Sequence, residues 1–248
     1  MKLGIMTGAR AASSDVNQIG RSVTIDEVVA LAQRAEAAGF SNLWMANVFA
    51  LDAIMTMAIA GRATKTLEVG TAVTPTYPRH PTAIAQQAVT AAAATGNRFV
   101  LGIGLAHKVM IEDALGISFA QPARHMREYL EVLAPLLRGE TLHYEGEQYT
   151  VRGLSVGAAG AGEVPLIVAA LGEHLLKLAG RHASGTITWM VGPRTLQGHI
   201  IPTIGTAARA AGRPAPRIIA GFPIVLTNKR SEERRVGKEG RSRWSPYH

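Results

Sequence analysis

The residues best suited to chemistry follow short apolar runs of the sequence. Five such positions occur, at Asn47 to Phe49, Ala72 to Tyr77, Leu105 to Lys108, Leu171 to His174 and Met190 to Gly192. If the runs before them are parallel strands of one barrel, the carboxyl ends of those strands meet at one face, where barrel enzymes place their active sites. We therefore expect these residues to surround one mouth.

Histidines are the first candidates for proton transfer, because imidazole titrates near neutral pH. His107 lies just after an apolar run, where it would act as an acid or base, or equally hydrogen-bond a loop carbonyl. His80 stands beside a proline and is interpreted as a turn residue. His125 and His182 fall on predicted helix surfaces, so no chemistry is assigned to them.

The stretch "AALGEH" places Gly172 at the start of a predicted helix. Free backbone N–H groups and the helix dipole favour a phosphate there, although an ordinary tight turn would use glycine too. Gly192 precedes a proline after the next apolar run and would shape the neighbouring wall. Trp44 and Trp189 lie on predicted strands and are assigned to the core.

Motifs for hydrolytic and metal chemistry are missing from the sequence. It contains no HExxH, no paired metal-ligand histidines, no Walker loop and no GxSxG elbow, so no metal site is predicted. With no cysteine, disulfides, thiolate zinc sites and a cysteine nucleophile are excluded. "MKLGIM" is too short an apolar run for a signal peptide and no run is long enough for a membrane span, so we expect a soluble cytoplasmic protein with no membrane partner.

Strand-like and helical stretches alternate along the chain, the order typical of a parallel sheet covered by helices. The expected strands are residues 2–6, 41–46, 67–73, 97–106, 164–171, 185–191 and 217–227. The expected helices are residues 24–40, 52–64, 81–95, 122–137, 172–183 and 194–211, the first with a capping box of Thr24 and Glu27. A small hairpin is expected at about 139–153, turning at Glu145 and Gly146.

Seven strands in a chain of 248 residues, 47% of them hydrophobic, predict one domain. We predict an α/β fold, a (β/α)8 TIM barrel that lacks one βα unit at its C-terminal side. An open Rossmann-type sheet is the alternative, but no GxGxxG follows the first strand.

Several stretches together resemble the luciferase-like monooxygenase superfamily, in particular its branch that uses the deazaflavin coenzyme F420. They include "VGTAVTPTYPRHPTAIAQQA", "GNRFVLGIG" and "PLIVAALGEHLLKLAGRHASGTITWM". "YLEVLAPLLRGETLHYEGEQYTV" is the most specific, because it is similar to the insertion that the family carries between its fourth and fifth strands. The resemblance spans residues 1 to about 228.

The resemblance implies a deazaflavin or flavin lying across the barrel mouth. It also implies a cis peptide bond without proline at the end of the third strand, here Ala72–Val73. Carried over residue by residue, it places Ala72, Val73 and Thr74 under the ring, and Leu171, Gly172, Met190, Val191 and Gly192 around the phosphate-bearing tail.

Two positions depart from the sugar-phosphate dehydrogenases that the resemblance includes. Those enzymes have an acid–base histidine after the second strand and a glutamate after the fourth, where this chain has Asn47 and His107. An amide cannot shuttle a proton, but it can hydrogen-bond a substrate or the ring, and His107 remains a candidate acid. The expected activity is hydride transfer between F420 and a small organic substrate. The alternatives are an FMN-dependent monooxygenase and a flavin-binding relative without turnover, and a homodimer is compatible with either.

Residues 230–248, "RSEERRVGKEGRSRWSPYH", differ in kind from the sequence before them. Residues 1–229 contain 20 Lys/Arg and 15 Asp/Glu, so their net charge is +5, compared with +8 for the whole chain. No dense basic stripe remains in them, so no nucleic-acid partner is expected. The segment reads like a translated sequencing adapter, apart from Gly240 in place of a cysteine. We expect residues 1–229 to form the barrel, and residues 230–248 to be a disordered, non-native tail on a truncated reading frame.

Overall fold

The computed structural model of the chain describes residues 2–8 and 22–224. Its main sheet is parallel and follows the chain in order, through β1 (Gly4–Thr7), β2 (Asn42–Met45), β3 (Glu68–Thr71), β5 (Phe99–Gly104), β8 (Leu166–Ala169), β9 (Gly185–Trp189) and β10 (Arg217–Gly221). The short β4 (Thr74–Pro75) also pairs with β5. Sequential order without a reversal confirms the predicted barrel over a Rossmann-type sheet, whose strand order reverses at a switch point.

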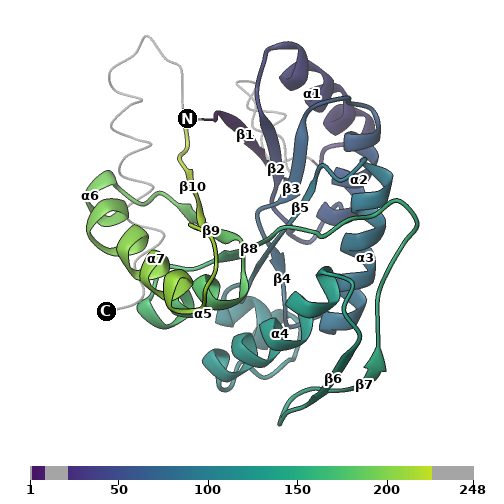
Figure 1. The fold of residues 1–248 in the computed structure, drawn as a ribbon. Coiled ribbons are helices and arrows are strands. Elements are labelled where there is room, and N and C mark those ends of the chain that lie inside the picture. Colours follow the sequence, from purple (N-terminus) through teal and green to yellow (C-terminus); the bar gives the residue numbers. More distant parts are fainter. Residues whose placement is uncertain (1, 9–21, 225–248) are drawn as a thin grey trace.

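The sheet curls so that its two ends approach each other (Figure 1). A Cβ built on Gly221 of β10 would lie 3.3 Å from the Cε of Met6 in β1. Within the described residues, β1 and β10 are the two edges of the curled sheet. The predicted strand 217–227 is observed as β10 up to residue 221, and both its last residues and the predicted tail 230–248 lie outside the described part of the chain.

Helices cover the outer face of the curled sheet (Figure 1). They are α1 (Ile25–Ala37), α2 (Ala53–Arg62), α3 (Pro81–Ala94), α4 (Pro122–Leu137), α5 (Glu173–His182) and α7 (Ile201–Ala210). The predicted capping box is present: the Thr24 side chain accepts from the Glu27 N–H, and the Glu27 carboxylate accepts from the Thr24 N–H. Within the described residues, no helix has the length and apolar character needed to cross a membrane.

Among residues 2–8 and 22–224, two segments depart from regular α-helix. The predicted helix 194–211 is divided into α6 (Pro193–Thr195), a π-helical turn η3 (Leu196–Ile200) and α7. A second π-helical turn, η2 (Met110–Ala114), follows β5 in a stretch for which no helix is predicted. Such turns often occur at functional sites.

Each strand divides its side chains between two cores, as a period of two requires. On β5, Leu101 and Ile103 pack outward with the helices, whereas Val100 joins an inner cluster with Trp44 and Ile167. The inner cluster confirms the core assignment of Trp44, which is 3% exposed. The same assignment is wrong for Trp189, which ends β9 and is 41% exposed at the rim.

The predicted hairpin is observed as β6 (Leu142–Glu145) and β7 (Thr150–Leu154), beside α4 (Figure 1). Its turn is fixed by Glu128 of α4, whose buried carboxylate accepts from the Gln148 N–H at 2.8 Å. Tyr144 donates its hydroxyl proton to Glu131, also of α4, at 2.6 Å. The hairpin therefore covers one side of α4.

Candidate functional site

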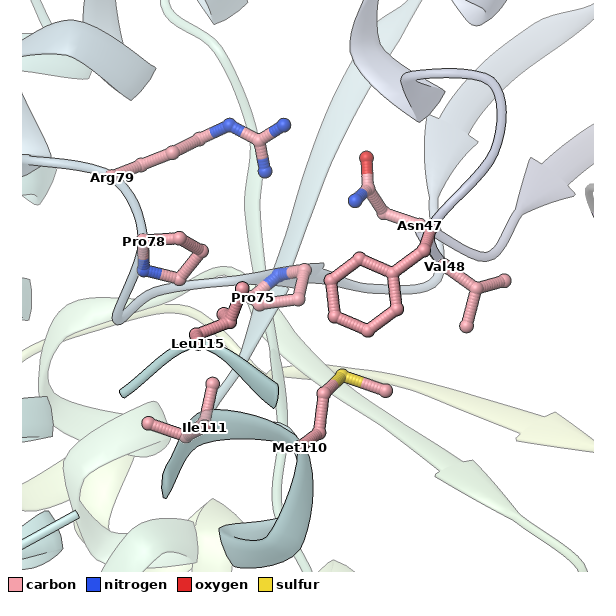
Figure 2. Close-up of a pocket in the computed structure, with 9 residues that line it drawn as sticks. Asn47, Val48, Pro75, Pro78, Arg79, Met110, Ile111 and Leu115 are labelled. Carbon is pink, nitrogen blue, oxygen red and sulfur yellow. The ribbon is translucent and has the colours of Figure 1, made fainter. Parts of the chain in front are cut away.

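A cavity of about 230 Å³ opens at the carboxyl ends of β2, β4 and β5 (Figure 2). Its lining comes from three segments, the first after β2, the second after β3 and the third formed by η2. The lining residues are Asn47, Val48, Phe49, Pro75, Pro78, Arg79, Met110, Ile111 and Leu115. The cavity thus lies at the end of the barrel where such folds hold their active sites.

Asn47 is fixed by two hydrogen bonds to neighbouring backbone. Its Oδ1 accepts from the Ala53 N–H at 3.0 Å in the first turn of α2, and its own N–H donates to the Val73 carbonyl at 3.4 Å. Because an N–H donor requires an oxygen partner, the amide orientation is settled and the nitrogen remains for other contacts. Figure 2 shows this nitrogen turned toward Pro75 and the oxygen turned away from it.

The peptide bond Ala72–Val73 is cis, which confirms the predicted position. The Ala72 N–H donates to the Met45 carbonyl at 2.7 Å, and this hydrogen bond ties the bend at the cis peptide to the end of β2. On its other side lies Gly104, where an added Cβ would stand 2.7 Å from the Val73 Cγ2 and 3.3 Å from the Ala169 Cβ. Any side chain at Gly104 would therefore collide with the bend.

Of the three residues predicted under the ring, Ala72 and Val73 are half-buried on the inner side of the barrel, against the inner cluster. Thr74 is fully buried, and its register partner Ile103 faces the helices. Paired residues of parallel strands point to the same side, so the Thr74 side chain points away from the mouth. Its hydroxyl has no hydrogen-bond partner among the described residues.

The residues predicted around a phosphate lie at the starts of two neighbouring helices. Gly172 is the N-cap of α5 and Gly192 the N-cap of α6, both with extended backbone and both exposed. A ring nitrogen of His199 lies 2.9 Å from the Leu171 carbonyl oxygen, which connects η3 with the loop before α5.

The other two residues predicted around the phosphate follow the end of β9. Met190 has a positive φ of 55° and donates its N–H to the Gly221 carbonyl at 2.8 Å. Val191 packs against the outer core.

His107 is exposed at the start of the segment leading to η2, and its carbonyl accepts from the Ile111 N–H at 3.1 Å. It does not belong to the cavity lining, whereas Asn47 does. The structure therefore brings Asn47 to the cavity and leaves His107 beside it.

His125 corrects a sequence interpretation: it is 4% exposed rather than on a helix surface, because the hairpin covers this side of α4. Its Nε2 lies 2.9 Å from the Thr76 Oγ1, and its ring stacks on Tyr77 at 3.9 Å between centroids and 4° between planes. Its Nδ1 lies 3.3 Å from both Gln148 Oε1 and Tyr149 Oη. Burial lowers the pKa of His125, against smaller raising effects from Gln148 and Glu128.

Arg79 connects the cavity with this buried region. Its guanidinium pairs with Asp52 at 2.5 Å, and its carbonyl accepts the Tyr129 hydroxyl proton at 3.1 Å. Asp52 also caps α2 by accepting from the Met55 N–H at 2.9 Å. The Arg79–Asp52 pair thus joins the segment after β3 to the start of α2, a contact that sequence patterns do not reveal.

The chain is similar in sequence to two named enzymes and in fold to a third. It is 30% identical over 236 residues to an F420-dependent glucose-6-phosphate dehydrogenase of Mycolicibacterium fortuitum, covering 89% of this chain and 69% of that one. It is 28% identical over 200 residues to a 5,10-methylenetetrahydromethanopterin reductase of Methanolobus tindarius, covering 80% and 60%. The fold matches the coenzyme F420 dependent tetrahydromethanopterin reductase of Methanopyrus kandleri with a TM-score of 0.73 at 23% identity, covering 88% of this chain and 65% of that one.

The chain therefore spans about two thirds of the length of these proteins. The sequence profile of the family described as luciferase-like monooxygenase matches residues 1–243, which is nearly the whole chain. The barrel order, the cis bend after the third strand and this match agree, and the chain belongs to the luciferase-like monooxygenase family.

Proposed function

We propose that the chain binds coenzyme F420 across the carboxyl ends of its strands and transfers a hydride between this cofactor and a small organic substrate. The observation that carries the proposal is a floor of small side chains across these strand ends. Gly104 has no room for a Cβ, and Ala169 stands next to it on β8. A flat ring needs such a floor, and both the half-buried Ala72 and Val73 border it.

The glycines at the helix starts support the position of the phosphate tail. Gly172 has a φ of −76°, which any residue adopts, and an added Cβ would meet nothing within 4 Å. The turn therefore does not itself require glycine, and the absence of a side chain leaves the first N–H groups of α5 accessible. Accessible N–H groups at a helix start favour a phosphate.

When bound, F420 supplies a ring carbon that accepts or releases a hydride. The chain's own residues position and shield the reactants. The apolar lining of the cavity disfavours water, and Asn47, whose oxygen is held by the Ala53 N–H, would donate a hydrogen bond from its amide nitrogen to the bound substrate. His107, exposed beside the cavity, is the candidate that exchanges a proton with solvent.

The cofactor is tested by titrating the full chain separately with F420 and with FMN and following tryptophan fluorescence. We expect quenching by F420, at least tenfold weaker binding in Gly104→Ala, and unchanged binding in Gly198→Ala, which an added Cβ leaves free of contacts. Because the added Cβ at Gly104 should lower the melting temperature, matching far-UV circular dichroism at the temperature of the titration is the control that the fold is kept. Binding of FMN alone would favour the monooxygenase alternative, and binding of neither would refute the proposal.

A further inference from the structure

The cavity at the strand ends has a polar side and an apolar side. Figure 2 shows Asn47 and Arg79 on one side, and Met110, Ile111 and Leu115 on the other. Phe49, Val48 and two prolines complete the lining. At about 230 Å³, the cavity lies below the roughly 300–1,000 Å³ of sites for drug-sized ligands.

Asn47 determines whether a ligand in the cavity must offer a hydrogen-bond donor or an acceptor. Its amide oxygen is already engaged by the Ala53 N–H, and among the described residues nothing hydrogen-bonds to its amide nitrogen. That nitrogen carries two donors. A ligand held here must therefore offer an acceptor, such as a carbonyl or hydroxyl oxygen.

Arg79 is the one charged side chain in the lining that the structure describes, and its charge is offset by Asp52 at 2.5 Å. A phosphate that took the guanidinium would displace a carboxylate that also caps α2. It would also enter a wall that is otherwise apolar, where an unpaired charge is costly. The cavity thus disfavours anions.

We propose that this cavity binds small, uncharged, mainly apolar molecules with one acceptor oxygen, held by the Asn47 amide nitrogen, and that it rejects sugar phosphates. The inference rests on the proposed function for its role as the substrate site, but the binding itself needs no cofactor. It also separates this chain from the glucose-6-phosphate dehydrogenase that it resembles.

The test uses the full chain, with and without F420, and measures binding of cyclohexanone and of glucose 6-phosphate by ligand-observed NMR. Cyclohexanone should bind, and glucose 6-phosphate should not displace it. Asn47→Asp keeps an oxygen for the Ala53 N–H but replaces the donor by an acceptor, so cyclohexanone affinity should fall about tenfold, the size of one hydrogen bond lost and one repulsion gained.

Asp52→Asn is the complementary variant. It keeps an oxygen for the Met55 N–H but leaves the Arg79 charge without its partner, so glucose 6-phosphate should now bind in the cavity. Unchanged cyclohexanone affinity in Asn47→Asp, or displacement of cyclohexanone from the unmodified chain by glucose 6-phosphate, would overturn the inference. If the unmodified chain binds cyclohexanone but does not bind F420, the proposed cofactor is refuted and the cavity assignment stays in place.

Discussion

Replacing His125 by phenylalanine gives the sharpest test of how the cavity wall is held. The ring that stacks on Tyr77 is kept, but the hydrogen bond to the Thr76 hydroxyl is lost. Thr76 is fully buried, and leaving a buried hydroxyl without a partner costs about 1–3 kcal/mol. We therefore expect His125→Phe to lower the free energy of unfolding by about that amount at pH 8, where the histidine is neutral.

The same substitution changes the pH dependence in a defined direction. Burial holds the pKa of His125 below its ordinary value of about 6.5, so the unfolded chain binds its proton first as the pH falls. Stability then decreases with falling pH between about 6.5 and the folded pKa, by up to about 1.4 kcal/mol per pH unit for one group. The pKa of His182 is also lowered, first by burial, so this histidine contributes to the pH dependence with the same sign as His125.

Urea denaturation at pH 8 and at successive values down to pH 5 measures both effects. His125→Phe should remove one of these contributions and flatten the acid-side slope, whereas Gly198→Ala, which adds a Cβ with nothing within 4 Å and removes no titratable group, should leave it unchanged. A slope equal to that of the unmodified chain, together with less than about 0.5 kcal/mol lost at pH 8, would refute the role assigned to His125.

Three further substitutions test how the barrel is built. Hydrogen bonds from three backbone N–H groups, that of Thr66 foremost, lower the pKa of Glu36 to about 2. Glu36→Gln should therefore destabilise the chain above pH 5, and it should remove the loss of stability that the unmodified chain shows as the pH falls from about 4.5 toward 2. Urea midpoints measured across this pH range test both effects. Gly180→Ala should cost about 1–3 kcal/mol, because its Cβ would lie 2.6 Å from the Ile204 carbonyl oxygen between α5 and α7, and calorimetry at pH 8 detects it. Thr24→Ala should cost about 1 kcal/mol through the lost cap of α1, visible as a lower urea midpoint with an unchanged slope.

Regular periodicity made the barrel predictable from sequence. Short apolar runs between helical stretches, the Thr24 cap and the hairpin turn predicted at Glu145 and Gly146 depend on near neighbours in the chain. The strand–helix order and the cap are observed, and the hairpin turns at residues 146–149, between β6 and β7. His125 was misplaced for the opposite reason. The periodicity of α4 identifies its apolar face, but not that the hairpin, some 20 residues later, covers another side of the same helix.

The cavity depends even more on contacts between distant segments. Asn47 was identified as a candidate because it follows a predicted strand, but its orientation is fixed by the first turn of α2. The sequence does not identify Arg79 as a site residue, since nothing in "PRHP" indicates a partner 27 residues earlier at Asp52. Met110 and Ile111 lie on a π-helical turn, which has no sequence signature comparable to a helix cap.

The segment from Pro75 to His80 has one side on the cavity and the other on buried polar groups. Pro75, Pro78 and Arg79 line the cavity, whereas α4 holds the segment through the Thr76 hydroxyl and the Arg79 carbonyl. The hairpin excludes water from the first of these contacts. Among the lining residues of this segment, Arg79 also holds it, through Asp52, whereas Pro75 and Pro78 make none of these contacts. The two proline positions can therefore change with little effect on the wall's position, which makes them a natural place for substrate specificity to vary while the barrel stays the same.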